Sequence, residues 1–203
     1  GKTTLFKCIL GILEPDRGKI EILSDNEKKA TSYRQNISYM PDTGGFYPLL
    51  SPLKNLEFRS SFNKNKKQGK EEALTWLKKL KLNTAGIKLS GNLSHGMQRR
   101  LAFACCMVND PDIILLDEPT NGLDPESTDL FIRLIKEMNS KNKTILINTH
   151  DLNLVKEICY KIILLQNGKV ISENKVVDIN KNLREFYMEK VDIYNKGNGE
   201  EDV

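Results

Sequence analysis

The sequence predicts an α/β fold with a mostly parallel β-sheet, an inserted α-helical lobe and a C-terminal β-hairpin. Three observations lead to this fold class. Short apolar runs alternate with segments of helical periodicity, which is typical of a parallel sheet covered by helices. A Lys-rich helical stretch interrupts that alternation. Two apolar runs near the end of the chain flank an Asn-Gly turn, which predicts the hairpin.

The N-terminal segment is predicted to be helical. Its apolar residues recur three and four positions apart, and they are Leu5, Phe6, Ile9, Leu10 and Leu13. Pro15 and Gly18 are helix breakers, so the helix should end before them. The runs "KIEIL" at 19–23 and "NISYM" at 36–40 are expected to be strands on either side of a polar connection.

The stretch from about 51 to 109 is expected to form the inserted lobe. Ser51 followed by Pro52 is a typical helix start, and the pattern predicts helices over 52–62 and 70–82. Many positive charges of the lobe are close together in the sequence: Lys64, Lys66, Lys67, Lys70, Lys78, Lys79, Lys81 and Lys88. They indicate either a solvated helix face or attraction to an anionic membrane surface or partner.

The rest of the chain is expected to alternate between helices and strands. The helices begin near 95, cover 126–140 and follow His150, and the strands are 112–117, 144–148, 161–166 and 169–173. The last two strands flank Asn167-Gly168, a dipeptide that favours the tight turn of a hairpin. The final residues, "GNGEEDV", lack apolar content and are expected to be disordered.

Composition is that of an ordinary globular chain. Hydrophobic residues make up 39% and charged residues 29% of the 203 residues, which is enough apolar content for a core. The net charge of +4 is too small to indicate a nucleic-acid partner. The 4 cysteines form no C-x-x-C pair and indicate a reducing compartment. No apolar run approaches the ~20 residues of a membrane span, so we expect a soluble intracellular protein.

The chain opens with "GKTT", which has the form of the end of a phosphate-binding loop, G-x-x-x-x-G-K-[ST]. Lys2 would contact phosphates and Thr3 would contact magnesium. The earlier half of the loop and an initiator Met are absent, so we expect the natural protein to continue upstream. Half a loop lacks the N–H groups that cradle the α- and β-phosphates. We therefore expect the chain as it stands to be inactive and its function to belong to the longer parent protein.

The run "IILLDEP" is a second candidate site. A buried strand that ends in Asp117-Glu118 would place two carboxylates at the carboxyl edge of the sheet, where ligands of open α/β folds bind. Asp117 would hold magnesium through water, and Glu118 would polarise the attacking water as general base. The alternative is a buried strand that ends in a solvated acidic turn.

The run "NLSHGMQRRL" is a third candidate. Ser94 is a good N-cap for the apolar helix that follows, and Gly96 allows a close backbone approach. A helix N-terminus presents unpaired N–H groups and the positive end of a dipole, which suits a phosphate. A capped helix without any ligand is the alternative.

Five motifs in this order resemble the nucleotide-binding subunit of ATP-binding cassette (ABC) transporters: "GKTT", "LSHGMQ", "IILLDEP", "TNGLD" and "NTHD". Ser94 lies 23 positions before Asp117, and His150 lies 32 after Glu118, which is similar to the family's spacing. The resemblance implies a P-loop ABC ATPase domain over 1–175. Residues 176–203 would then form a C-terminal helix and an acidic tail.

The resemblance also implies a role for each motif. The end of the phosphate loop would bind ATP through Gly1, Lys2, Thr3 and Thr4, with the Thr3 hydroxyl on magnesium. Ser94 and Gly96 would belong to the signature motif, which reaches the γ-phosphate bound by the opposite subunit. Asp124 would be the D-loop acid that touches that subunit. His150 would contact the γ-phosphate, although a lone histidine is more often structural.

Two positions depart from the family's pattern. The usual signature is L-S-G-G-Q, and here His95 and Met97 replace a Gly and the Gln, a variant similar to that of exporter ATPases. The Q-loop normally has a Gln after its Pro, whereas Asp42 follows Pro41 here. Asp42 can bind magnesium, but it adds negative charge beside the γ-phosphate.

Taken together, the resemblance implies an ATP hydrolase that uses ATP and Mg²⁺. Its expected partners are a second ABC ATPase subunit, in a homo- or heterodimer, and a transmembrane permease subunit. It would be peripheral on the inner face of the cell membrane and would drive export. One alternative is a ribosome-associated ABC protein, but those carry two cassettes and a charged linker. The other is a catalytically inactive binding module, which Glu118 and His150 argue against.

Overall fold

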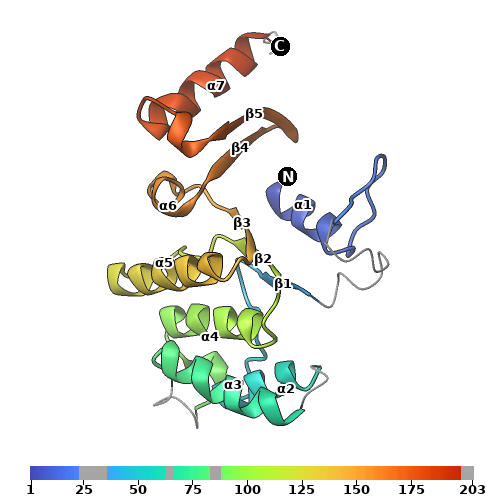
Figure 1. The fold of residues 1–203 in the computed structure, drawn as a ribbon, viewed down its shortest axis with the longest axis vertical. Helices are drawn as coiled ribbons and strands as arrows, with labels where there is room; N and C mark the ends of the chain where they lie inside the picture. Colours follow the sequence, from blue (N-terminus) through green and yellow to red (C-terminus); the bar gives the residue numbers. More distant parts are fainter. Residues whose placement is uncertain (23–35, 63–65, 83–87, 198–203) are drawn as a thin grey trace. The chain divides into compact units, whose positions relative to one another are not determined.

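The computed structural model describes residues 1–22, 36–62, 66–82 and 88–197 (Figure 1). The chain forms two compact units. The smaller contains Gly1–Glu14 and Thr149–Val203, and the larger contains Pro15–Asn148.

A three-stranded parallel sheet is the centre of the larger unit. The strands are β1 (Ile37–Met40), β2 (Ile113–Asp117) and β3 (Thr144–Asn148), in the order β1-β2-β3. Met40 pairs with Leu116, and Asp117 pairs with Asn148. Because all three strands are parallel, their carboxyl ends meet at one edge of the sheet. The predicted α/β fold with a parallel sheet is thus confirmed.

Helices of the same unit pack against this sheet and against one another. They are α2 (Pro52–Ser60), α3 (Lys66–Lys79), the short 3₁₀ helix η3 (Ser90–Asn92), α4 (His95–Met107) and α5 (Pro125–Ser140). Helix α4 contacts β1 on one side and the α2–α3 pair on the other (Figure 1). The ring of Phe103 on α4 lies 4.9 Å from that of Phe131 and 6.0 Å from that of Trp76. Helix α4 is therefore fixed by core packing along its length.

The starts of these helices follow from their sequence. Ser51 Oγ accepts a hydrogen bond from the Lys54 amide at 3.3 Å, and Ser94 Oγ accepts one from the Met97 amide at 3.4 Å. Both serines are the N-caps that the sequence predicts, because their oxygens satisfy an N–H group of the first turn. Asp124 caps α5 in the same way.

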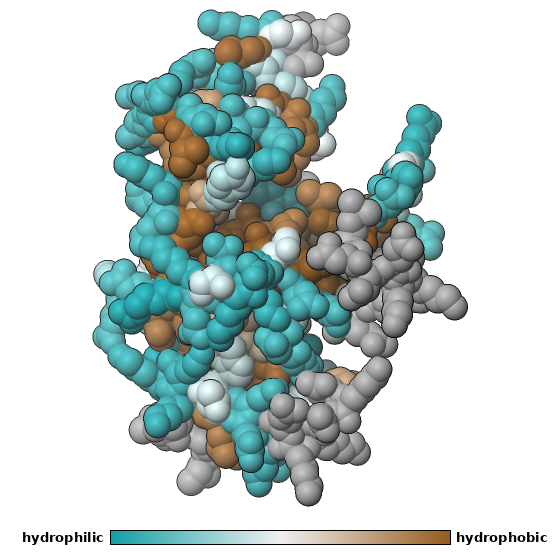
Figure 2. All heavy atoms as spheres, in the orientation of Figure 1, coloured by the Kyte–Doolittle hydropathy of each residue, from teal (hydrophilic) through white to brown (hydrophobic). Residues whose placement is uncertain are grey.

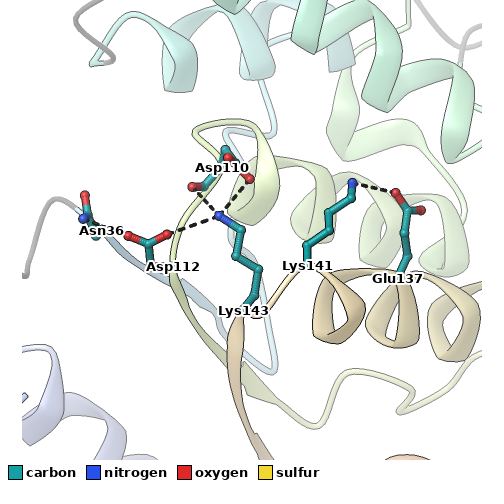
Figure 3. A network of polar contacts seen from close by, with 6 residues as sticks. All are labelled: Asn36, Asp110, Asp112, Glu137, Lys141 and Lys143. Atoms are coloured by element: carbon teal, nitrogen blue, oxygen red, sulfur yellow. Dashed lines mark hydrogen bonds and ion pairs between the residues drawn. The ribbon is translucent and has the colours of Figure 1, made fainter. Parts of the chain in front are cut away.

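A polar network ties the amino ends of the three strands together (Figure 3). Lys143, whose side chain is 11% exposed, precedes β3 and lies 3.1 Å from the Asp110 carboxylate and 3.3 Å from that of Asp112. Asn36, just before β1, donates to Asp112 at 2.9 Å. These contacts hold the edge of the sheet opposite to Asp117, so they stabilise the strands away from the predicted site.

The described part of the smaller unit contains an antiparallel hairpin, three α-helices and a 3₁₀ helix. These elements are α1 (Lys2–Ile9), α6 (Leu152–Ile158), β4 (Lys161–Gln166), β5 (Lys169–Lys175), the 3₁₀ helix η4 (Val176–Asp178) and α7 (Leu183–Gly197). Its core is the buried cluster of Val155, Ile162, Leu164, Leu183 and Phe186. Asn167 and Gly168 join the strands with φ of 49° and 77°, the left-handed geometry that a tight hairpin turn requires. This confirms the predicted hairpin.

Three expectations about local structure turn out differently. Residues 19–22 are not a strand, because no hydrogen-bonded neighbour flanks them in the described part of the chain. Helix α3 begins at 66 rather than 70. The expected disordered tail falls mostly at 198–203, outside the described residues. Within the described ranges, no helix combines the length and the apolar character needed to cross a bilayer.

Candidate functional site

The two acidic residues of "IILLDEP" lie at the carboxyl edge of the sheet. Asp117 is the last residue of β2 and is only 3% exposed. Glu118 follows it, and its backbone N–H donates to the Asn148 carbonyl at 2.8 Å. A buried central strand thus delivers both carboxylates to the edge where ligands of parallel sheets bind.

Glu118 has an unusual backbone conformation. Its φ is 45°, in the left-handed region that side chains other than Gly rarely adopt. Such a residue costs about 1–3 kcal/mol and persists only where its surroundings over-determine it. Here the surroundings are the Asn148 carbonyl on one side and, on the other, the Arg99 guanidinium, which donates to the Glu118 carbonyl. Strained residues of this kind concentrate at functional sites.

Arg99 on α4 is one of the site residues that the sequence motifs do not identify. It is 4% exposed and donates to backbone carbonyls on both loops at this edge: Pro41 at 2.9 Å and Asp42 at 2.5 Å after β1, and Asp117 at 3.3 Å and Glu118 at 2.5 Å after β2. A signal was present in the sequence. Arg99 lies three and four residues before Ala102 and Phe103, which both face the core, so the helical period places it on the buried side.

Tyr39 on β1 contacts the first of the two acids. Its hydroxyl donates to Asp117 Oδ2 at 3.2 Å. The pKa of Tyr39 rises to about 12, first because of burial and then because of the Asp117 carboxylate. Tyr39 therefore stays protonated at neutral pH and is a constant hydrogen-bond donor to Asp117.

This pKa gives a direct test of the neighbourhood. Difference titration of tyrosinate absorbance between wild type and Tyr39→Phe should show one phenol ionising at about pH 12. In an Asp117→Asn background the same difference should move to lower pH, because the carboxylate no longer opposes ionisation. It should remain above the ordinary value of 10.0, because burial is the larger cause. A phenol that titrates identically in both backgrounds would contradict the Tyr39–Asp117 contact.

The segments that contain "LSHGMQ" and "TNGLD" also lie together in the larger unit. A Cβ built on Gly96 would lie 3.8 Å from Asp124 Oδ2, and one built on Gly122 would lie 2.9 Å from a ring atom of His95. The His95 ring thus packs over Gly122, whose φ of 69° also favours glycine. Asn121 of the same loop donates to Asp42 at 3.4 Å. The structure therefore brings Asp42 and the start of α4 into contact with the "TNGLD" loop.

Asp124 has a structural role in the larger unit. Its carboxylate accepts hydrogen bonds at 2.9 Å from both the backbone N–H and the hydroxyl of Ser127. These bonds hold the pKa of Asp124 below its ordinary value. Its predicted contact with another subunit stays a prediction.

The remaining predicted site residues lie in the smaller unit. Lys2, Thr3 and Thr4 form the first turn of α1, and Gly1 is its N-cap without a side-chain cap hydrogen bond. His150 is exposed and lies just before α6, whose N-cap is Asp151. Their roles toward a nucleotide stay predictions.

The donor set at the sheet edge fits a magnesium nucleotide. Asp117 offers carboxylate oxygens, which Mg²⁺ prefers, and Mg²⁺ is usually held by one or two carboxylates together with phosphates and water. No group of three or more His, Cys, Asp or Glu suited to a metal exists among the described residues. Beside Asp117, the buried Nδ2 of Asn148 has no hydrogen-bond partner within the described ranges. The sheet edge therefore has a hydrogen-bond donor, Asn148 Nδ2, that is available to a ligand.

Residues 1–121 match the family described as ABC transporter. The chain is 33% identical over 175 residues to Nod factor export ATP-binding protein I of Burkholderia pseudomallei, covering 85% of this chain and 58% of that protein. It is also 33% identical over 186 residues to methionine import ATP-binding protein MetN 1 of Oenococcus oeni, covering 88% of this chain and 53% of that protein. The chain thus spans somewhat more than half the length of these relatives.

Solved structures give the same result. One, an ATP-binding subunit of an ABC transporter, superposes with a TM-score of 0.84 at 26% identity and covers 94% of this chain and 83% of that chain. Another is an ATP-binding cassette in a dimeric post-hydrolysis state bound to ADP and phosphate. It has a TM-score of 0.74 at 29% identity and covers 87% of this chain and 81% of that chain.

Proposed function

The chain belongs to the ABC transporter family, and we propose from this that it is part of an ATP-binding and ATP-hydrolysing subunit of a transporter. One observation supports the hydrolytic role above the others. Glu118 is held in a strained conformation directly after the buried Asp117, at the carboxyl edge of a parallel sheet.

Asp117 and Glu118 have different proposed roles in ATP hydrolysis. Asp117 would hold Mg²⁺, with Thr3 and Asp42 as further ligands, and the bound ion would neutralise charge on the phosphates. Glu118 would accept the proton of the attacking water at its carboxylate. Gly1, Lys2, Thr3 and Thr4 would bind phosphates, and His150 would contact the γ-phosphate. Tyr39 and Arg99 hold the acids in place through the hydrogen bonds described above.

The second half of the site is proposed to come from another subunit. Ser94 and Gly96 lie at the N-terminus of α4, whose dipole favours an anion. In a head-to-tail dimer these residues and Asp124 would face the nucleotide held by the partner. A solved relative is described as dimeric, which supports this arrangement.

Export is the proposed direction of transport. The signature "LSHGM" and the acidic Asp42 are similar to those of exporter ATPases, and one relative is a Nod factor export protein. The permease would be a separate membrane subunit, which would place the ATPase at the cytoplasmic face of the membrane. ATP-dependent transport in vesicles that contain both subunits tests this proposal. Import rather than export, or no transport, would overturn the assigned direction.

The surface around α2 offers a docking site for that permease. Four apolar residues form the α2 apolar patch: Tyr47 at 48% exposure, Leu49 at 79%, Phe58 at 41% and Phe62 at 71%. The ring of Phe58 packs edge to face against those of Tyr47 and Phe62, with centroid distances of 5.1 and 5.2 Å. The face drawn in Figure 2 carries both hydrophilic and hydrophobic side chains. Aromatic and aliphatic anchors of this kind suit a helix of a membrane subunit.

The loop that carries the patch is well anchored. Asn55 of α2, fully buried, accepts a hydrogen bond from the Tyr47 amide at 2.6 Å. Its own amide donates to the Tyr47 carbonyl at 2.9 Å and to Ser90 Oγ at 3.0 Å. The exposed side chains of the patch are therefore presented by a fixed backbone, so their truncation should leave the fold intact.

Leu49→Ala is expected to weaken stimulation of ATP hydrolysis by the permease about 10-fold, as for the loss of an interface anchor. Basal hydrolysis should stay near wild type, because Leu49 is far more exposed than a core residue. The measurement is phosphate release by the full-length protein with and without its permease in detergent. Val177→Ala, at 76% exposure in the smaller unit, is the matched control. Equal stimulation of the two variants would contradict the docking site.

A further inference from the structure

Arg99 connects the two loops that carry the proposed magnesium and water-activating acids. Its Nη1 donates to the carbonyls of Pro41 and Asp42, and its Nη2 donates to those of Asp117 and Glu118. One planar guanidinium therefore serves the β1 loop with one nitrogen and the β2 loop with the other. The planar guanidinium holds its two Nη atoms in a fixed relative orientation, so it fixes the β1 loop relative to the β2 loop, which a lysine ammonium does not do.

The same guanidinium acts on the strained residue. Glu118 is in the left-handed region, and its carbonyl accepts from Arg99 Nη2 at 2.5 Å while its N–H donates to Asn148. The Asn121 amide donates to the same Glu118 carbonyl at 3.2 Å. Without Arg99, the Glu118 carbonyl would lose its strongest hydrogen bond, because a charged donor makes a stronger bond than the neutral Asn121 amide does.

Stability alone is a weak explanation for this arginine. Burial lowers its pKa, against the opposing effect of the Asp42, Asp117 and Glu118 carboxylates. Its Nε is buried without a hydrogen-bond partner in the described chain. A buried charge whose hydrogen bonds are incomplete often contributes little net stability. The arrangement is better explained by the geometry that it imposes on the two loops.

We propose that Arg99 is a positioning residue that sets the spacing between Asp42 and the Asp117–Glu118 pair and holds the Glu118 backbone in its left-handed conformation. This inference rests on the proposed ATPase function. The inference gives Arg99 on α4 a role in aligning Glu118, the proposed general base. Arg99 itself need not touch the nucleotide.

The test compares Arg99→Lys and Arg99→Met in the full-length protein. Arg99→Met should lower kcat for ATP hydrolysis by about 10²-fold, the effect of a small misplacement of a catalytic group. Arg99→Lys keeps the charge but reaches one loop only, so it should lower kcat about 10-fold. In both, the Kd for ATP without Mg²⁺ should stay within about threefold of wild type, because the hydrogen bonds of Arg99 in the described part of the chain go to backbone carbonyls of the protein.

Lys143→Met is the matched control, because it also removes a cation that ties two strands of this sheet together, here β2 and β3 at their amino ends (Figure 3). It should lower Tm and leave kcat unchanged. If Arg99→Met does not fold, Arg99→Lys carries the test. A wild-type kcat in Arg99→Lys would overturn the proposal. So would a loss of Tm and ATP affinity in step with the loss of kcat.

A second readout separates this proposal from the ATPase function. Hydrogen exchange of the Glu118 amide should be about 10-fold faster in Arg99→Lys than in wild type, because Arg99 also donates to the Asp117 carbonyl, which shares a peptide group with the Glu118 N–H, and the opening of that peptide becomes easier. Exchange of the Leu115 amide, in the middle of β2, should be unchanged. If wild type hydrolyses no ATP, the proposed function fails, and the exchange result still decides the positioning role. Unchanged exchange at Glu118 would overturn it.

Discussion

Glu118→Gln is expected to lower the rate of ATP hydrolysis by about 10²–10⁴-fold while ATP still binds. The amide is isosteric with the carboxylate and keeps the backbone contacts to Arg99 and Asn148. It has no basic oxygen that can take the proton of water, so only the chemical step should suffer. Phosphate release under saturating Mg-ATP measures the effect.

The matched control for this change is Glu126→Gln. Glu126 is an exposed acid in the first turn of α5, in an ion pair with Lys81 at 2.6 Å. A surface pair of this kind contributes little, so the variant should hydrolyse ATP at the wild-type rate. If Glu118→Gln and Glu126→Gln had the same activity, Glu118 would not be the general base.

Asp117→Asn should abolish the Mg²⁺-dependent part of ATP binding. In wild type, Mg-ATP at 100 times its Kd should stabilise the fold by about 2.7 kcal/mol. The variant loses the buried one of the two proposed carboxylate ligands for magnesium, so this stabilisation should largely disappear. Asn still offers an oxygen to the Tyr39 hydroxyl, so stability without nucleotide should change by only about 1 kcal/mol. Denaturant unfolding with and without Mg-ATP measures both quantities.

Asp112→Asn is the control at the other end of β2. Asp112 accepts from Asn36 and lies 3.3 Å from Lys143, in the network of Figure 3. Its loss should leave the gain from Mg-ATP at the wild-type value. A full gain from Mg-ATP in Asp117→Asn would mean that this buried carboxylate does not hold the ion.

Local patterns were enough to predict most elements of the fold. The N-caps Ser51 and Ser94 and the turn Asn167-Gly168 depend on neighbours in sequence, and the structure has all three. Residues 19–22 show the limit of such patterns. An apolar alternation favours a strand, but a strand also needs a hydrogen-bonded partner, and none flanks these residues in the described ranges.

The sequence predicted those parts of the candidate site that lie within a single motif. Asp117 and Glu118 could be placed at the sheet edge because a buried strand ends there. Arg99, Tyr39 and Asn148 could not be assigned, because their contacts join segments far apart in the chain. The Arg99–Asp42 bond spans 57 positions and the Tyr39–Asp117 bond spans 78. Only the folded chain shows which carbonyl or carboxylate such a side chain meets.

The measurement that tests the central claim most directly is the identity of the nucleotide in the isolated dimer. Wild type and Glu118→Gln full-length protein are incubated with Mg-ATP, the dimer is separated by size, and the bound nucleotide is extracted and analysed. Wild type should give ADP or no stable dimer, and Glu118→Gln should give a dimer that contains intact ATP. ADP in the Glu118→Gln dimer, formed as fast as in wild type, would contradict the assignment of this sheet edge as the hydrolytic centre.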